Sequence, residues 1–422
     1  MEYASMSPAA LQAEREEQEA RYQELCGRGL ALDLSRGKPA ADQLAISMPM
    51  LGITEYRNGK GIDCRNYGLL EGLPEMRRLF SELTGIAAEN ILVGGNSSLN
   101  MMYDSVARAM LYGVAGSERP WCREERVVFL CPVPGYDRHF RVCESLGIAM
   151  VNIAMNGDGP DMDAVEEAVK DPAVKGIWCV PKYSNPTGIT YSDEVVRRLC
   201  RMKTAAPDFR IFWDNAYAIH DLQEEGDSLL DVFETARAYG NEDRIFYYTS
   251  TSKVTFPGAG VAMMAASGNN LGQILPILGS QTIGTDKLNQ LRHVLFLRDR
   301  ETTSAIMRRH AACIRPKFEA MLSVLDRELT GLGIAEWTRP RGGYFISLDV
   351  ECGCATRVYE RCKAAGVTLT GAGATYPYGR DPEDRNLRLA PTYATVEEIR
   401  QATEVLCCVI RLTAAEKRVG EA

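Results

Sequence analysis

The chain has 422 residues, of which 45% are hydrophobic and 25% are charged, and its formal net charge is −8. These values are typical of a globular enzyme with two or three domains, and the acidic balance argues against nucleic acid or an anionic membrane as the main partner. No apolar run reaches the length of a membrane span, and residues 1–21 lack the features of a signal peptide, so we expect a charged helix there.

The thirteen cysteines are scattered through the chain, and several lie within apolar segments, as Cys131, Cys179 and Cys407 do. A chain of this length does not need disulfides for stability, so we expect reduced core cysteines and a cytoplasmic protein. The close pair Cys352 and Cys354 has no second Cys or His pair near it, and we therefore expect no metal site.

From Ile91 to about Ala266, short apolar strands alternate with stretches of helical period. This alternation predicts a mostly parallel sheet with helices on both faces. The expected strands are 91–93, 127–130, 148–153, 176–180, 210–213 and 245–248.

The last third of the chain has a mixed pattern. We expect a long helix from Lys287 to about Arg327, then a helix at 355–365, a strand at 367–369 and a final helix from Thr395. The expected organisation is an N-terminal segment (1–60) that joins the small domain, a large domain (61–305) and a small α+β domain (306–422).

Several polar residues come just after the expected strands. In open α/β sheets ligands bind at this edge, so we expect these side chains to converge although they are far apart in sequence. They are Ser97, Tyr136, Asn185, Asp214, Tyr217 and Lys253.

Lys253 follows a buried strand and a run of hydroxyl residues. An ammonium is costly to desolvate, so a lysine here either extends to water at the strand end or uses its amine, for example to form an imine with an aldehyde. The sequence around Lys253 alone leaves both readings open.

The turn from Gly94 to Ser98 lies between a strand and a helix start, where free amides, the helix dipole and two hydroxyls suit a phosphate. No Walker lysine follows, and no GxGxxG is complete, which disfavours a nucleoside triphosphate or a dinucleotide.

Asp214 follows the apolar Trp213 and is either a turn or cap residue or the partner of a cation such as a protonated pyridine. Asn185 and Tyr217 could hydrogen-bond a phenolate oxygen of that ring, and Tyr136 could stack on its face. A phosphate, a pyridinium, a phenolate and an amine that accepts an aldehyde together describe pyridoxal phosphate.

Four short motifs occur in the order Asn185-Pro186-Thr187-Gly188, Asp214-x-Ala216-Tyr217, Ser250-x-Ser252-Lys253 and Asn386-x-Arg388. With them, the chain from about Leu32 to Arg388 resembles the fold-type I enzymes of the class I aminotransferase superfamily, close to the aspartate aminotransferases. The resemblance implies the α/β PLP-dependent transferase fold, with a mostly parallel seven-stranded sheet flanked by helices and a smaller α+β domain.

The resemblance also implies a role for each matching residue. Lys253 would be the Schiff-base lysine and proton shuttle, Asp214 the partner of the pyridinium nitrogen, and Arg388 the clamp for the substrate carboxylate. Tyr67 would reach the phosphate from the neighbouring subunit, which implies a homodimer with shared active sites. The remaining assignments are Tyr217 and Asn185 on the phenolic oxygen, Gly95, Asn96, Ser97 and Ser250 on the phosphate, Tyr136 on the ring, and Gly37 and Asn185 beside the substrate.

One departure is clear: many relatives carry an arginine for the phosphate about eight residues after the lysine, where this chain has Gly258 to Ala262 without one. Together with the Pro-Val-Pro-Gly sequence before Tyr136 and the turn Asn96-Ser97-Ser98, this gap resembles a divergent bacterial subgroup of aspartate aminotransferases.

The expected reaction is ping-pong transamination from an L-amino acid, first aspartate, to a 2-oxo acid, first 2-oxoglutarate. A dicarboxylic substrate needs a second cation, for which the candidates are Arg36, Lys38, Lys287, Arg292 and Arg341. The alternatives are transamination of alanine or aromatic amino acids, a PLP-dependent carbon–sulfur β-lyase, and a PLP-sensing module without turnover. The sensor is disfavoured because the short acidic N-terminus contains no basic recognition helix.

Overall fold

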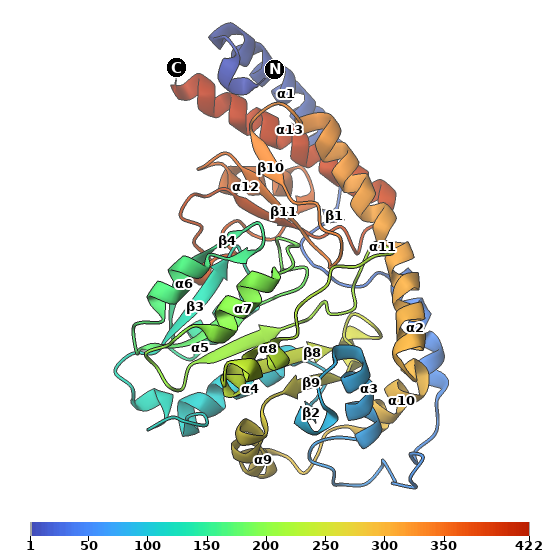
Figure 1. The fold of residues 1–422 in the computed structure, drawn as a ribbon. Coiled ribbons are helices and arrows are strands. Elements are labelled where there is room, and N and C mark those ends of the chain that lie inside the picture. The colour runs from blue at the N-terminus through green and yellow to red at the C-terminus, as the bar shows by residue number, and fades with distance from the viewer. Residues whose placement is uncertain (1, 422) are drawn as a thin grey trace.

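The computed structural model describes residues 2–421, and its centre is a twisted sheet (Figure 1). Strands β8, β7, β6, β3 and β4 run parallel to one another, while β2, β9 and β5 pair antiparallel. In spatial order the strands are β2 (Ile91–Val93), β9 (Ala262–Ala265), β8 (Ile245–Ser250), β7 (Arg210–Asp214), β6 (Val174–Cys179), β3 (Val128–Val133), β4 (Ala149–Asn156) and β5 (Gly159–Pro160).

The expected mostly parallel sheet is confirmed, but it has eight strands in the described residues, and the expected number of seven is wrong by one. Strand β5 has only two residues and ends in Pro160, which has no N–H to donate and is tolerated here because the strand lies at the sheet edge.

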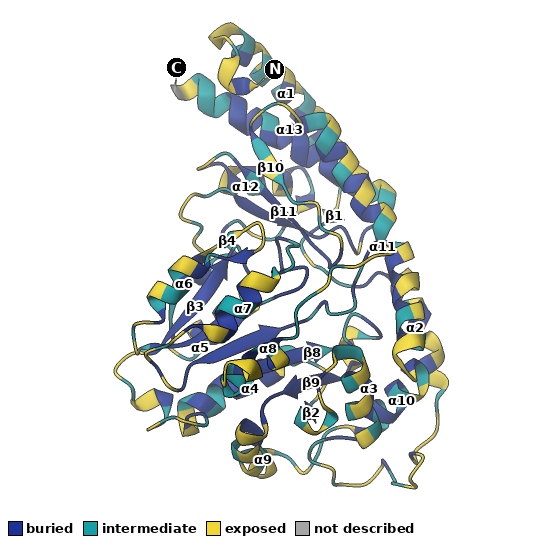
Figure 2. Ribbon diagram, viewed as in Figure 1, coloured by how far each residue is buried: buried dark blue, intermediate teal, exposed yellow. Residues whose placement is uncertain are grey.

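Helices cover both faces of the sheet because successive strand residues point to opposite sides. Phe212 packs into one apolar cluster and its neighbour Trp213 into the other. The central strands are buried, β4 is partly exposed, and the outer helix faces are exposed (Figure 2). The helices of this part are α3 (Pro74–Thr84), α4 (Ser98–Tyr112), α5 (Asp137–Ser145), α6 (Met162–Ala168), α7 (Asp193–Arg201), α8 (Val232–Ala238), α9 (Gly268–Gln281) and α10 (Lys287–Leu297).

A second body forms around a small antiparallel sheet of β10 (Ala335–Trp337), β11 (Ile346–Val350) and β13 (Asn386–Leu389). The N-terminal helix α1 lies beside the C-terminal helix α13 in this body, and β1 pairs with β12 (Figure 1). Its other elements are α1 (Pro8–Gly27), β1 (Leu32–Asp33), α11 (Arg300–Leu329), α12 (Ala355–Ala364), β12 (Val367–Thr368) and α13 (Val396–Glu421). Helix α2 (Ala41–Ser47) packs against α11, and its Ile46 belongs to an apolar cluster of the large sheet.

The expected single helix from Lys287 to Arg327 is wrong, because two helices, α10 and α11, occupy this stretch with a turn between them. Arg298 has a positive φ of 59°, and the side chain of Asp299 caps the next helix by accepting from the amide of Thr302 at 2.7 Å. The expected domain boundary between residues 305 and 306 falls inside α11.

Short 3-10 helices join these elements at Tyr3–Ser5, Met48–Gly52, Ala88–Asn90, Trp121–Arg123, Glu242–Arg244, Pro257–Ala259 and Pro377–Gly379. Within residues 2–421, no helix combines the length and the apolar character that crossing a membrane requires.

Candidate active site

A cavity of about 290 Å³ opens at the carboxyl ends of the central strands, where β7 ends at Asp214 and β8 at Ser250. Parallel strands bring these ends together at one edge of the sheet, and residues of the second body close the other side. The lining residues are Gly37, Asn96, Ser97, Ser98, Leu99, Met102, Tyr136, Val180, Asn185, Asp214, Ala216, Tyr217, Ser250, Ser252, Lys253, Pro257, Phe345 and Arg388.

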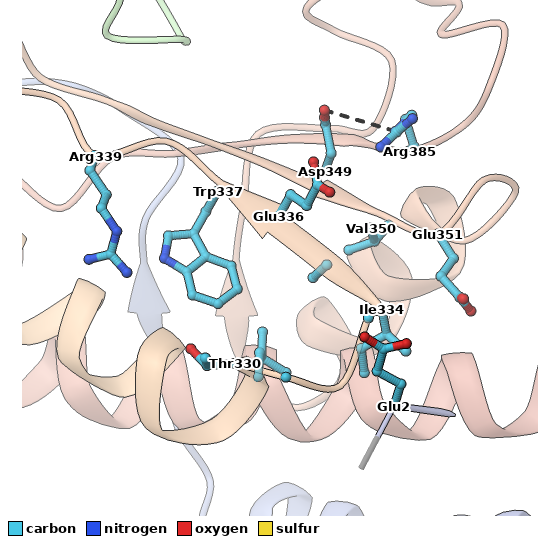
Figure 3. Close-up of a pocket in the computed structure, with 14 residues that line it drawn as sticks. Glu2, Thr330, Ile334, Glu336, Trp337, Arg339, Asp349, Val350, Glu351 and Arg385 are labelled. Atoms are coloured by element: carbon cyan, nitrogen blue, oxygen red, sulfur yellow. Dashed lines mark ion pairs between the residues drawn. The ribbon is translucent and has the colours of Figure 1, made fainter. Parts of the chain in front are cut away.

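A larger cavity of about 640 Å³ lies along β10 in the second body (Figure 3). Its charged side chains are of both signs and include the ion pair between Arg385 and Asp349 at 3.9 Å. None of its lining residues is a lysine, cysteine, serine or histidine. Its carboxylates and arginines include no amine that could form an imine, so the cavity beside Lys253 is the candidate for the predicted chemistry.

The amine of Lys253 lies over two aromatic rings, 5.1 Å from the ring centroid of Tyr217 and 5.8 Å from that of Tyr344. Burial lowers the pKa of Lys253 from its ordinary value of 10.5, and the negative charge of Asp214 opposes the shift. A lysine that loses its proton more easily is a better nucleophile toward a carbonyl carbon.

Asp214 forms a hydrogen bond with His139, whose Nε2 lies 3.0 Å from Oδ2 of the carboxylate. The other oxygen, Oδ1, is buried and has no hydrogen-bond partner among the described residues. A buried carboxylate oxygen without a partner is costly, so it favours a cationic donor in the cavity. A protonated ring nitrogen is a donor of that kind.

At one end of the cavity, helix α4 begins directly after Ser97, which is its N-cap residue. The Ser97 side chain makes no cap hydrogen bond to the helix. The first amides of α4 and its dipole therefore favour an anion. Two hydroxyls lie beside the same turn: Ser250 Oγ donates to Ser252 Oγ at 2.9 Å, and Ser252 Oγ donates to the carbonyl of Asn96 at 3.1 Å. Each hydroxyl can rotate and donate its proton to a bound anion instead. The only cations among the cavity's lining residues are Lys253 and Arg388.

Arg388 reaches the cavity from β13 and is only 9% exposed. Its guanidinium donates to Asp137 Oδ1 at 2.9 Å and lies 5.0 Å from the ring centroid of Phe345. Asn185 Oδ1 lies 3.5 Å from the same guanidinium, so an amide and a cation face one substrate position. This arrangement suits a carboxylate at the end of the cavity nearest the second body.

Tyr136 is half-buried at the same cavity, with its ring edge-on to His139 at 5.0 Å between centroids. Burial raises the pKa of Tyr136 to about 12, with further contributions from the charges of Asp214 and Asp137. Tyr136 therefore stays neutral and offers an aromatic face.

The structure brings most of the predicted site residues to this cavity and leaves two outside its lining. Gly95 belongs to the turn before α4 but does not line the cavity, and Tyr67 is 83% exposed. The ten that line the cavity are Gly37, Asn96, Ser97, Tyr136, Asn185, Asp214, Tyr217, Ser250, Lys253 and Arg388.

None of the five candidate second cations lines the cavity. Lys287 donates to the carbonyls of Asn66 and Gly68 at 2.6 and 2.9 Å and so holds the loop that carries Tyr67. The others are placed as follows: Arg36 is exposed, Arg292 is half-buried on α10, Lys38 lies 3.8 Å from the ring centroid of Tyr393, and Arg341 is 3.3 Å from Asp227.

Sequence reasoning missed His139 and Phe345. His139 stands three residues after Tyr136 at the start of α5, so the helical spacing that places it beside Tyr136 was a signal that could have been used. Phe345 carried no such signal, because its contact with Arg388 depends on how β11 and β13 pair.

The residues present fit pyridoxal phosphate, the known cofactor of the fold-type I aminotransferases. The unpartnered Asp214 Oδ1, the uncapped start of α4 and the buried amine of Lys253 match its ring nitrogen, phosphate and aldehyde. The phosphate end has no arginine, in agreement with the gap noted at Gly258–Ala262.

Known proteins support the same conclusion. A family model described as aspartate amino-transferase matches residues 6–422. An aspartate aminotransferase of Corynebacterium glutamicum is 46% identical over 425 residues, covering 98% of each chain. A crystal structure of an aspartate transaminase from Corynebacterium glutamicum aligns with a TM-score of 0.95 at 45% identity, covering 98% of this chain and 99% of that one.

A more distant structure, the α-aminoadipate aminotransferase LysN of Thermus thermophilus with N-(5'-phosphopyridoxyl)-L-leucine, shares the fold at 24% identity and a TM-score of 0.72, covering 96% of this chain and 97% of that one. The resemblance inferred from the four motifs is thereby confirmed. The chain belongs to the aspartate aminotransferase family, and it is a transaminase of the class I type.

Proposed function

We propose that this transaminase uses pyridoxal phosphate to move the amino group of L-aspartate to 2-oxoglutarate in a ping-pong reaction. The observation that carries the proposal is the convergence of Lys253, Asp214 and Arg388 on one cavity, with Asp214 Oδ1 free of any partner among the described residues. An amine, an anion for a ring nitrogen and a cation for a carboxylate are the three groups that the chemistry requires.

When bound, pyridoxal phosphate supplies an aldehyde that condenses with amines and a ring that takes up the electron pair released at the substrate Cα. Asp214 would hold the ring nitrogen, Tyr217 and Asn185 the phenolic oxygen, and Tyr136 the ring face. The phosphate would be held by Gly95, Asn96, Ser97 and Ser250 with the amides of α4. Because no arginine lines that end, the helix dipole and hydroxyls would carry most of the phosphate affinity.

Lys253 would take the Cα proton and return it, because its amine is buried beside the substrate position and its pKa is lowered by burial. Arg388, with Asn185 beside it, would bind the substrate α-carboxylate at the opposite end of the cavity from α4. Gly37 lines the cavity on the substrate side. Fixing the carboxylate at one end orients the Cα–H bond toward the lysine.

Aspartate is the proposed donor because the Corynebacterium glutamicum relative, 46% identical over 98% of both chains, is named an aspartate aminotransferase. The cavity of a single chain offers only Lys253 and Arg388 as cations. The distal carboxylate of a dicarboxylic substrate would therefore be met by polar groups of the cavity or by a cation from a second subunit.

We further propose a homodimer with shared sites. Tyr67 is 83% exposed, although burial of an aromatic ring is favourable. Ile283 is 61% exposed, and the residue after it, Gly284, lies against the backbone of Gly68. The buried ammonium of Lys287 fixes the loop on both sides of Tyr67, so the ring is presented outward. A second copy of the chain would cover this surface and receive Tyr67 near its phosphate site.

The thirteen free cysteines are consistent with a reducing compartment, which we propose to be the cytoplasm.

The deciding experiment mixes the cofactor-loaded enzyme with each amino acid alone and follows loss of the absorbance of the Lys253-bound cofactor. Aspartate and glutamate should react fastest, and each should yield its 2-oxo acid. Faster reaction of alanine or an aromatic amino acid would replace aspartate as the donor. Pyruvate and ammonia from a cysteine conjugate would show a β-lyase, and no 2-oxo acid from any amino acid would contradict transamination.

Lys253→Ala tests the attachment point. The wild-type protein should carry a borohydride-reducible link to Lys253, and the variant should not. A reducible link that persists in Lys253→Ala, located on another lysine by peptide mapping, would remove Lys253 from this role.

A further inference from the structure

Lys253 is fixed by residues far from it in sequence. The carbonyl of Val254, the next residue, is 3.1 Å from His310 Nε2 on α11 and accepts from Ser47 Oγ on α2 at 3.3 Å. His310 is 1% exposed and Ser47 fully buried, so neither contact competes with water. Helix α2 therefore touches the backbone immediately after the lysine.

The same helix also holds an aromatic ring that the lysine amine faces. Gln43 Nε2 donates to the hydroxyl of Tyr344 at 3.0 Å, and the ring centroid of Tyr344 is 5.8 Å from Lys253 Nζ. Gln43 is completely buried, and its Oε1 accepts from the amide of Ala40 at 3.2 Å. The carboxamide orientation is thus set by the backbone at the start of α2.

Gln43 joins these two contacts into one chain of hydrogen bonds. Its Nε2 lies 3.2 Å from His310 Nδ1, while the Nε2 of His310 faces the carbonyl of Val254. Only one arrangement satisfies every group: His310 is neutral, donates from Nε2 and accepts at Nδ1. A protonated imidazole would set an N–H against the N–H of Gln43. Burial also lowers the pKa of His310, in the same direction.

The segment just before α2 lines the cavity. Gly37, which belongs to that lining and packs against the ring of Phe345, is a few residues before Gln43. Helix α2 thus follows the cavity-lining segment, and its buried Gln43 and Ser47 contact Tyr344 and the backbone carbonyl after Lys253.

We propose that Gln43 and His310 are positioning residues for Lys253: they hold Tyr344 and the Val254 carbonyl so that the amine stands at its working position in the cavity. This inference rests on the proposed role of Lys253. Neither residue lines the cavity, so each acts through the lysine rather than on substrate.

The test compares cofactor-loaded wild type with Gln43→Met, Tyr344→Phe, the double variant and the control Gln290→Met. Gln290 is as buried as Gln43 and makes two hydrogen bonds of its own, to the amide of Leu73 and to Thr285, outside this chain. Gln43→Met and Tyr344→Phe should each lower kcat with aspartate by about ten-fold, because a misplaced amine transfers the proton poorly. The KM should stay within about two-fold, since Arg388 is untouched.

Two further readouts separate positioning from general instability. The pH titration of the absorbance of the Lys253-bound cofactor should shift in Gln43→Met and stay at the wild-type value in Gln290→Met, even if both variants melt at lower temperature. The double variant should lose no more than about the larger single effect, because both substitutions break the same path. If Gln43→Met fails to fold, Tyr344→Phe, which removes one hydroxyl, still decides the question.

Wild-type kcat and an unchanged titration in Gln43→Met or in Tyr344→Phe would overturn the inference. An equal loss of kcat in Gln290→Met, or full additivity in the double variant, would also overturn it. If instead the wild type forms no reducible link to Lys253, the proposed function itself fails and the positioning role with it.

Discussion

His139 Nε2 lies 3.0 Å from Asp214 Oδ2, and the imidazole stacks on Trp178 with 4.4 Å between ring centroids and 9° between ring planes. The indole fixes the ring orientation, and the ring fixes one carboxylate oxygen. The other oxygen remains for a ligand in the cavity. His139 thus orients the anion that we propose for the ring nitrogen of the cofactor.

From this contact we expect substitution of Asp214 to lower kcat more than substitution of His139. Asp214→Ala should retain some cofactor but lower kcat by about a hundred-fold or more, because the charge that favours the protonated ring is lost. His139→Asn should lower kcat by about ten-fold, because the charge stays but its orientation is loosened. Stopped-flow measurement of the aspartate half-reaction, with cofactor content checked by absorbance, distinguishes the two. Near-normal kcat in Asp214→Ala would refute its role.

Arg388→Lys keeps the positive charge but removes the planar fork that binds a carboxylate at two points. We expect kcat/KM for aspartate to fall by about a hundred-fold, mainly through KM, because the α-carboxylate is held in both the ground and the transition state. Arg380→Lys, on the exposed surface of the same body, is the control and should match wild type in a steady-state assay. Equal kinetics for both variants would remove the assignment of Arg388.

Gly37→Ala tests the close packing on the substrate side. A Cβ at Gly37 would clash with the ring of Phe345, which itself covers the guanidinium of Arg388. The ring must move, so we expect kcat/KM to fall by about ten-fold. Gly27→Ala at the end of α1, where a Cβ meets nothing within 4 Å, should leave kinetics unchanged. Steady-state kinetics of both variants checks this, and an unaffected Gly37→Ala enzyme would show that the ring relaxes without cost.

His293 makes stability depend on pH. Burial lowers its pKa from 6.5 to about 4, so between these values the unfolded chain binds more protons than the folded one. The free energy of unfolding should therefore be highest above about pH 6.5 and fall, by up to about 3 kcal/mol, as the pH drops toward 4.

Urea unfolding at several pH values between 7.5 and 5 measures this slope. His293→Gln should be less stable at pH 7.5, because the contact of His293 Nε2 with Thr255 Oγ1 at 2.8 Å is lost, but it should show a flatter slope. Some slope should remain, since burial lowers the pKa values of His220 and His310 as well. A slope as steep as that of the wild type would assign the effect to other groups.

The sequence by itself determined the fold class and the family, and it proposed the group of residues that line the cavity. Alternating apolar runs predicted the parallel sheet, and the residues just after the strands, including Asp214 and Lys253, were identified as a group at one edge. These inferences succeed because side-chain periodicity and the meeting of parallel strand ends are consequences of local backbone geometry. The four motifs then indicated the family.

Only the tertiary structure decided which groups support that site. His139 is 75 residues from Asp214, and Gln43 is 267 residues from His310. The side-chain periodicity also gave no sign that the helix is interrupted at Arg298 or that Lys287 donates to backbone carbonyls. Contacts of this kind depend on how packed helices and the two bodies meet, and a hydrogen bond is made or lost over less than an ångström, which no local pattern encodes.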